Sequence, residues 1–480
     1  MTAPIGLSLS CMCNSTAVAL LESNKTVYRS VDLLDISSTV DNQSCTSLQG
    51  KVVKDYGGNF VWSVKMQGYV VSALFVGGFI MAYPAGFIVD RYSARHMMSL
   101  SIGLLVFASV IFPTLASFFG PYGAIFSRFL MGFSEVMMIP ALNAVVTKWI
   151  PLHEKSLAAS MFTAGNQVAG MTGTPLAAEL CASSLGWPAI FYTGAMFGIV
   201  FLILWHLTVR NSPSSTKWIH EKEIEYIKYH IPTKRNSIDA VKKSVPWKSM
   251  LTSLPFWALI VNSFMGNMMI ALIFVYIPVY FKDVLMLDVQ ANGFYSAIPH
   301  FSNLISKLIW GYFMDKLRQK NVLSNTATVR FSQATAMFGI SISCFFLRYM
   351  DCSTPIYSLL LLSSVSAFFG VSISGFYTSL LSVAPSHIGV ITSISTVIGF
   401  IGRIIIPQII SYFKTVGTME EWGQVFLIYV FASFISALIF GLFGSGEVQE
   451  WDYSKTHPAA GIALKALQDG QEDEDLDILD

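Results

Sequence analysis

The chain has 480 residues, of which 53% are hydrophobic and 12% are charged, and its mean hydropathy is +0.57. This is more apolar surface than a water-soluble fold of this length needs to bury, which favours a protein that crosses the membrane many times. The 30 Lys and Arg residues balance 29 Asp and Glu residues, so the composition gives no case for a nucleic-acid partner, which requires a basic excess on one face.

Apolar runs of about 20 residues, the length of helix that crosses about 30 Å of hydrocarbon, recur along the chain. Strands of a membrane barrel would be half as long and would alternate strictly, so we predict an all-α membrane protein. Twelve transmembrane helices are predicted, at 4–21, 66–89, 97–119, 124–150, 156–180, 187–209, 255–280, 293–313, 327–347, 356–383, 388–413 and 423–443.

The first run, 4–21, begins almost at the start of the chain. It has no basic segment before it and it contains Asn14, which argues against a signal peptide. We interpret it as a short first transmembrane helix, with a sequence truncated at its start as the alternative.

The cysteines have no C-x-x-C metal spacing, and the eight histidines form no ligand cluster on one span. We therefore expect no metal and no cofactor. The six cysteines, which we predict to be buried thiols, are Cys11, Cys13, Cys45, Cys181, Cys344 and Cys352.

Positive charge predicts the orientation in the membrane. The connection 210–253 holds nine Lys and Arg against four Asp and Glu, and the other basic connections fall on the same side, which is therefore cytoplasmic. The loop 22–61 falls on the opposite, lumenal or extracellular, side and contains the glycosylation sequons of Asn24 and Asn42. With twelve spans, both termini are cytoplasmic.

An internal repeat divides the chain. The sequence GFIVDR at 86–91 returns as GYFMDK at 311–316, each time at the cytoplasmic end of the second helix of a six-helix half. We predict an N-terminal half at 1–209, a cytoplasmic linker at 210–253, a C-terminal half at 254–443 and an acidic cytoplasmic tail at 444–480. Related halves with a site between them are typical of alternating-access carriers.

The repeated motif resembles the loop motif of the major facilitator superfamily. Its glycine allows close helix approach, and its Asp can accept from the N-terminal N–H groups of a helix in the other half. We predict a cytoplasmic latch, closed when the carrier faces outward; the alternative is that its Arg residues are ordinary positive-inside anchors. The predicted latch residues are Gly86, Asp90, Arg91, Arg95, Gly311 and Asp315.

Further segments resemble the solute carrier family 17 group, which includes sialin, the vesicular glutamate transporters and the sodium–phosphate type. They include SRFLMGFSEVMMIP at 127–140, GWPAIFY at 186–192, NGFYSAIPH at 292–300 and GSGEVQEW at 444–451. This resemblance implies transport of small organic or inorganic anions coupled to protons, sodium or membrane potential, at a plasma, endolysosomal or vesicular membrane. We expect a monomer.

Arg128 and Glu135 lie seven residues apart in a predicted helix and so share one face. An ionisable pair inside the membrane is costly unless it faces a cavity or a partner. Arg128 suits a carboxylate or phosphate, and Glu135 suits proton coupling. The alternative is that the two residues only pair to fix the helix, and the two roles are compatible.

The sequence also departs from the family. Met12 replaces the Arg usual in the first helix, and Gly266 and Met131 stand where glutamate transporters and sialin-like members carry an Arg and a Glu. Two unusual cations are candidate anion ligands: Arg403, near the middle of the helix 388–413, and Lys307, for which snorkelling to the cytoplasmic face is the simpler explanation.

No enzyme motif is present, so we predict no enzymatic activity. The rival functions are a channel-like anion conductance and a transport-inactive family member that acts as a receptor. The tail carries ten Asp and Glu against two Lys, which is typical of a solvated segment; its end, 474–479, resembles an acidic di-leucine sorting signal.

Overall fold

The computed structural model describes residues 4–23, 29–30, 52–150, 155–210, 245–320 and 322–452, with positions 220, 222–223 and 226–227 of the linker. Side chains at 23, 29–30, 52, 83, 86–87, 89–91, 147–148 and 155–163 are outside the description. Asn24, Asn42 and Cys45 lie outside the described residues, as does most of the predicted linker and tail.

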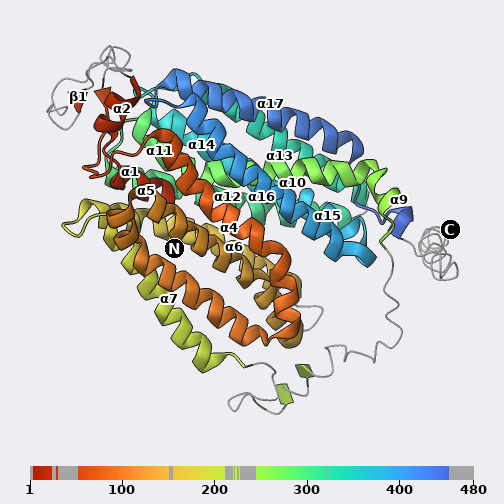
Figure 1. The fold of residues 1–480 in the computed structure, drawn as a ribbon. Coiled ribbons are helices and arrows are strands. Elements are labelled where there is room, and N and C mark those ends of the chain that lie inside the picture. The colour runs from red at the N-terminus through yellow and green to blue at the C-terminus, as the bar shows by residue number, and fades with distance from the viewer. Residues whose placement is uncertain are drawn as a thin grey trace, which may run out of the picture.

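Helices make up nearly all of the described chain (Figure 1). In the first half these are α1 (Ile5–Met12), α2 (Ser15–Ser23), α4 (Val64–Arg91), α5 (Ala94–Trp149), α6 (Lys155–Ala182) and α7 (Pro188–Thr208). The second half contains α9 (Trp247–Leu251), α10 (Leu254–Ala271), η6 (Leu272–Tyr276), α11 (Ile277–Asp283), α12 (Val289–Gln319), α13 (Asn325–Leu347), α14 (Pro355–Val371), η7 (Ser372–Ser374), α15 (Phe376–Ser382), η8 (Pro385–His387), α16 (Ile388–Phe413), α17 (Met419–Phe443) and η9 (Glu450–Asp452). A two-stranded parallel piece pairs β1 (Arg29–Ser30) with β2 (Val52–Val53).

Most predicted spans correspond to a single helix each. One exception is α5, a single helical element that covers two predicted spans. α5 runs through the predicted spans 97–119 and 124–150 and reverses direction at Gly120, whose φ of 58° and ψ of −140° are non-helical. Glycine tolerates this backbone, and Pro121 follows it. By length and composition alone, seven segments of the described chain qualify as membrane spans, and the longest of them, Ala94–Val146, covers both passes of α5.

The first predicted helix is not continuous. α1 ends at Met12, Cys13 is extended with φ −97° and ψ 133°, and α2 begins at Ser15. The side-chain oxygen of Asn14 accepts the N–H of Ala17 at 2.7 Å, which is how an Asn side chain caps a helix N-terminus. The apolar run 4–21 therefore forms two short helices, because the Asn that interrupts it starts a new one.

The prediction of buried thiols is wrong for three cysteines and confirmed for two. Cys11 in α1 and Cys181 in α6 form a disulfide, and Cys352 is disulfide-bonded as well, whereas Cys13 and Cys344 are free and buried. Spacing along the chain did not reveal the first pair, because its members are 170 residues apart. Disulfides persist in oxidising compartments, so their position at the predicted lumenal end supports the orientation assigned from charge.

The two halves meet along the parts of two helix pairs that lie toward the predicted lumenal side. α4 packs on α16, where a Cβ on Gly68 would lie 3.1 Å from the carbonyl oxygen of Pro407. α6 packs on α12, where a Cβ on Gly293 would lie 2.4 Å from the Cβ of Ala178. From this region the bundles diverge toward the end opposite α1, α2 and α11 (Figure 1).

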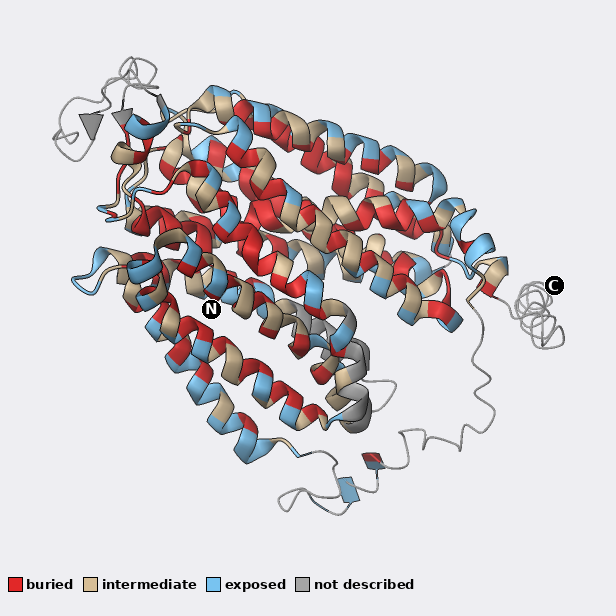
Figure 2. Ribbon diagram, in the orientation of Figure 1, coloured by how far each residue is buried: buried red, intermediate tan, exposed pale blue. Residues whose placement is uncertain are grey.

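Burial follows the expected pattern for a helix bundle in lipid. Buried residues face neighbouring helices, while the outer faces of α7 and α17 are exposed (Figure 2). Those faces carry large apolar side chains such as Phe197, Leu204 and Phe431. Exposed apolar surface of this kind is suited to contact with acyl chains.

Candidate functional site

Arg128 lies in the second pass of α5 and is 1% exposed. Its Nη1 is 3.7 Å from the sulfur of Met131, and its Nε is buried without a hydrogen-bond partner among the described residues. The neighbouring hydroxyl of Ser127 donates to the carbonyl of Ala108 at 2.7 Å, which fixes this pass against the first one. The guanidinium is thus held in place while part of its hydrogen-bonding capacity is unused.

Glu135 lies two turns further along α5. Between the two residues, Gly132 packs so tightly on α4 that a Cβ would lie 1.7 Å from the carbonyl oxygen of Leu74. The Oε2 atom of Glu135 is buried, and it too has no hydrogen-bond partner in the part of the chain that the structure describes.

Arg403 approaches the same region from the other half. Its guanidinium carbon lies 5.6 Å from the ring centre of Phe400 on α16 and 5.9 Å from that of Phe75 on α4. Stacking on aromatic faces suits the planar, weakly hydrated guanidinium. Its Nε is buried without a partner among the described residues. Arg403 therefore packs across the interface between the halves, and its Nε–H group is available to donate a hydrogen bond to a ligand.

Glu135 interacts electrostatically with both Arg128 and Arg403. None of the described ion pairs within 4.0 Å joins the carboxylate to either guanidinium. Two cations and one anion from the two halves therefore lie in one region, and none of the described ion pairs joins them directly. We name Arg128, Glu135 and Arg403 the central charge cluster.

Lys307 belongs to a different set of contacts. Its Nζ lies 3.5 Å from the Oε1 atom of Gln167 on α6, and the Nε2 atom of Gln167 donates to Asn303 on α12 at 3.0 Å. These bonds join the halves near the middle of α6 and α12. Sequence analysis missed Gln167 and Asn303; the signal that could have drawn attention to them is an uncharged amide within a predicted span.

The predicted cytoplasmic latch is only partly described. Arg95 donates through Nη2 to the main-chain oxygen of His206 at 2.8 Å, within its own half. Asp315 pairs with Arg318 at 3.2 Å, also within its own half, and both side chains are largely exposed. Gly311 has open space at its Cβ position, with only the Ser374 hydroxyl near, at 4.0 Å. Gly86, Asp90 and Arg91 lie in α4, but their side chains are outside the description. The latch stays a prediction.

The profile of the Major Facilitator Superfamily matches residues 42–407. A Caenorhabditis elegans protein described as uncharacterized transporter slc-17.3 is 38% identical over 455 residues, which cover 93% of this chain and 85% of that protein. Sialin of Ovis aries is 31% identical over 434 residues, which cover 88% and 86%. The chain belongs to the solute carrier family 17 group of the major facilitator superfamily.

Other comparisons agree with this family 17 assignment. Vesicular glutamate transporter 2 of Mus musculus is 31% identical over 412 residues, which cover 85% of this chain and 70% of that protein. The inward open structure of the xylose transporter XylE from E. coli superposes with a TM-score of 0.60 at 16% identity, over 92% of this chain and 94% of that one. That likeness shows the fold alone. The protein is a multi-pass membrane transporter with the major facilitator fold.

Proposed function

We propose that this transporter moves small organic or inorganic anions by alternating access, with the central charge cluster as the substrate and coupling site. The observation that carries the proposal is that Arg128, Glu135 and Arg403 each present a buried polar atom without a hydrogen-bond partner among the described residues. Buried polar atoms are normally satisfied, so a shared lack of partners points to a ligand. The names of the relatives sialin and vesicular glutamate transporter support the substrate class.

The charges of the cluster suggest how coupling works. With Glu135 ionised, the formal charge of the two guanidiniums and the carboxylate is +1; with Glu135 protonated, it is +2. A bound anion therefore favours the protonated form, and a proton on Glu135 favours the bound anion. This mutual dependence is thermodynamic linkage, and it ties anion movement to proton movement. Coupling to sodium or to membrane potential would not require Glu135 to gain and lose a proton.

We propose a class of substrate, small anions, and not one particular anion. Two positions differ from those of the relatives: Met131, which replaces an acidic residue of sialin-like members, contacts the Arg128 guanidinium. Gly266, which replaces an Arg of the glutamate transporters, has only the ring of Phe369 near its Cβ position, at 3.9 Å. Lys307 remains a candidate anion ligand of lower rank, because its contact is with Gln167 rather than with the central charge cluster.

The first prediction separates the roles of Arg128 and Glu135. In proteoliposomes screened with radiolabelled anions under imposed pH, sodium and voltage gradients, Arg128→Gln should abolish uptake and exchange, since a buried anion without its counter-charge costs several kcal/mol. Glu135→Gln should retain anion exchange but lose pH-driven accumulation, because a neutral side chain no longer changes its charge. Full pH-driven accumulation by Glu135→Gln would contradict the coupling role.

Two alternatives give different results in the same experiment. A channel-like protein should show uptake without dependence on a coupling ion and without exchange. A transport-inactive receptor should show neither uptake nor exchange with any anion while retaining its fold.

A further inference from the structure

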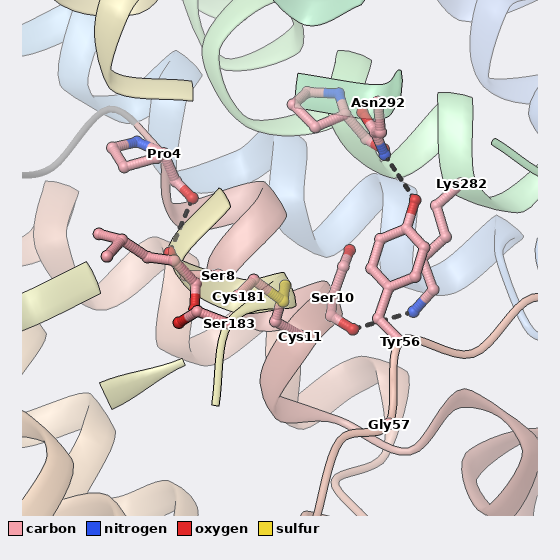
Figure 3. The surroundings of a disulfide bond; sticks show 12 residues. Pro4, Ser8, Ser10, Cys11, Tyr56, Gly57, Cys181, Ser183, Lys282 and Asn292 are labelled. Atoms are coloured by element: carbon pink, nitrogen blue, oxygen red, sulfur yellow. Dashed lines mark hydrogen bonds between the residues drawn. A yellow bond between two sulfur atoms is a disulfide. The ribbon is translucent and has the colours of Figure 1, made fainter. Parts of the chain in front are cut away.

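The lumenal contact between the halves is built around Lys282. This residue lies in the last turn of α11 and is 3% exposed. Its Nζ donates to the main-chain oxygen of Ser10 at 3.1 Å and to the hydroxyl of Ser15 at 2.5 Å, and it lies 4.9 Å from the ring centre of Tyr56. All three partners belong to the N-terminal half; Figure 3 shows Lys282 reaching Ser10 beside the disulfide.

The partners of Lys282 flank the break in the first membrane segment. Ser10 lies in the last turn of α1, and Ser15 is the first residue of α2. The carbonyl groups at a helix C-terminus lack partners within the helix and carry partial negative charge, so a cation there is stabilised. The ammonium of one half thus occupies the gap between two helices of the other.

Tyr56 strengthens the same junction. Its hydroxyl donates to the main-chain oxygen of Leu287 at 2.8 Å and accepts from the side-chain amide of Asn292 at 3.0 Å (Figure 3). Both partners belong to the C-terminal half. Tyr56, whose ring contacts the Lys282 ammonium, is therefore also hydrogen-bonded to the C-terminal half, to which Lys282 belongs.

These contacts must break when the halves separate on the lumenal side. The Cys11–Cys181 disulfide ties α1 to α6, so the Ser10 carbonyl moves with the N-terminal half. α1 also lies directly against η6 of the other half, because a Cβ on Gly6 would be 1.8 Å from the carbonyl oxygen of Val275. The described hydrogen bonds and ion pairs between the halves all lie at the depth of Lys307 or on its lumenal side.

Lys414 provides a contrast within the same space. Lys282 and Lys414 both line a cavity of about 70 Å³ between α1, α4, α11 and α16, together with the free thiol of Cys13. Lys414 pairs with Asp283 at 2.6 Å, and both belong to the C-terminal half. That ion pair can persist when the halves separate, whereas the bonds of Lys282 cannot.

We propose that Lys282 is the lumenal gate residue of this transporter, whose ammonium closes the lumenal side by binding the α1–α2 break and releases it when that side opens. The gate rests on the proposed function only in that it assumes alternating access. It requires neither a particular anion nor a particular coupling ion.

The native thiol of Cys13 reports on the gate. A membrane-impermeant maleimide is applied from the lumenal side to the full-length protein in proteoliposomes, without reductant and without substrate, and Cys13→Ser gives the background. Lys282→Met should label roughly tenfold faster than the unmodified protein, because it removes two charge-assisted bonds that hold the closed state. Lys414→Met is the matched control and should label at the unmodified rate.

Two outcomes overturn the proposal: labelling of folded Lys282→Met at the unmodified rate, or equal acceleration by Lys414→Met. If Lys282→Met fails to fold, Ser15→Ala decides, since it removes one acceptor and should label a few-fold faster; an unchanged rate there overturns the gate as well. Since labelling needs no transport, absence of anion uptake alongside gated labelling would reject the proposed substrate class and leave the gate intact.

Discussion

Buried charge without direct partners is the main feature at the scale of single residues. Arg128 is 1% exposed, and the Nε atoms of Arg128 and Arg403 lack partners among the described residues. An ionised group inside the membrane is costly, and a merely structural role would be served as well by an apolar side chain of similar volume. The rings around Arg403 and the sulfur beside Arg128 offset part of this cost and leave donors for a ligand.

A second prediction follows for Arg403. Arg403→Met keeps an unbranched stem between Phe75 and Phe400 but removes the charge, so anion affinity should fall roughly tenfold or more while the protein still folds. Arg403→Lys, the matched variant, retains the charge and should lose less. The measurement is the anion concentration that half-saturates exchange. Unchanged affinity in Arg403→Met would remove Arg403 from the substrate site.

At the scale of elements, glycines allow close helix approach both within one half and between the two halves. Gly132 allows α5 to touch α4 within the N-terminal half, whereas Gly6 allows α1 to touch η6 across the interface between the halves. At both positions a Cβ would lie within 2 Å of a backbone carbonyl oxygen, which cannot shift as the end of a flexible side chain can. The same substitution should therefore have different consequences at the two sites.

Gly132→Ala should impair the fold itself, because overpacking within one half costs about 1–3 kcal/mol or more. A lower midpoint of thermal unfolding, or loss of expression, is the expected result. Gly6→Ala should instead fold and hold the lumenal side apart, so Cys13 should label faster from that side. Equal thermal destabilisation by both variants, without faster labelling in Gly6→Ala, would show that the contact of α1 with η6 is part of the fold rather than of a moving interface.

In the whole molecule, the described hydrogen bonds and ion pairs between the halves lie at the depth of Lys307 or toward the predicted lumenal side. Lys54 of the first half and Asp288 of the second are joined at 2.6 Å on that side, and Ser72 on α4 donates to the main-chain oxygen of Ile404 on α16 at 3.1 Å. Asp315, at the opposite end, pairs within its own half. If the predicted cytoplasmic latch closes that end in the outward-facing state, it would be released in this arrangement.

Asp90→Asn tests that latch. If Asp90 closes the cytoplasmic side in the outward-facing state, its loss should leave folding intact and raise the population of the conformation described here. A cysteine introduced at Gly266, where the Cβ position is open, should then become more accessible from the cytoplasmic side. Unchanged accessibility alongside normal expression would count against the latch and leave Arg91 and Arg95 as orientation anchors.

The amino-acid sequence by itself determined the class of protein, the family and most of the helical spans. Each follows from local information: apolar runs of membrane length, the repeat of GFIVDR as GYFMDK, and ordered family motifs along the chain. The spacing of Arg128 and Glu135 likewise placed them on one helix face, because helical periodicity relates residues only a few positions apart.

Tertiary structure alone decided which distant residues meet. Lys282 and Ser10 are 272 residues apart, Cys11 and Cys181 are 170 apart, and Arg403 reaches Phe75 across the interface between the halves. No periodic pattern encodes these contacts, since they depend on how the two bundles pack. The break at Asn14 was visible in the sequence as a polar residue in an apolar run. Its role became apparent only when the ammonium of Lys282 was found between the two helices that the break creates, because a cation is stabilised there by carbonyl groups that helix ends leave free.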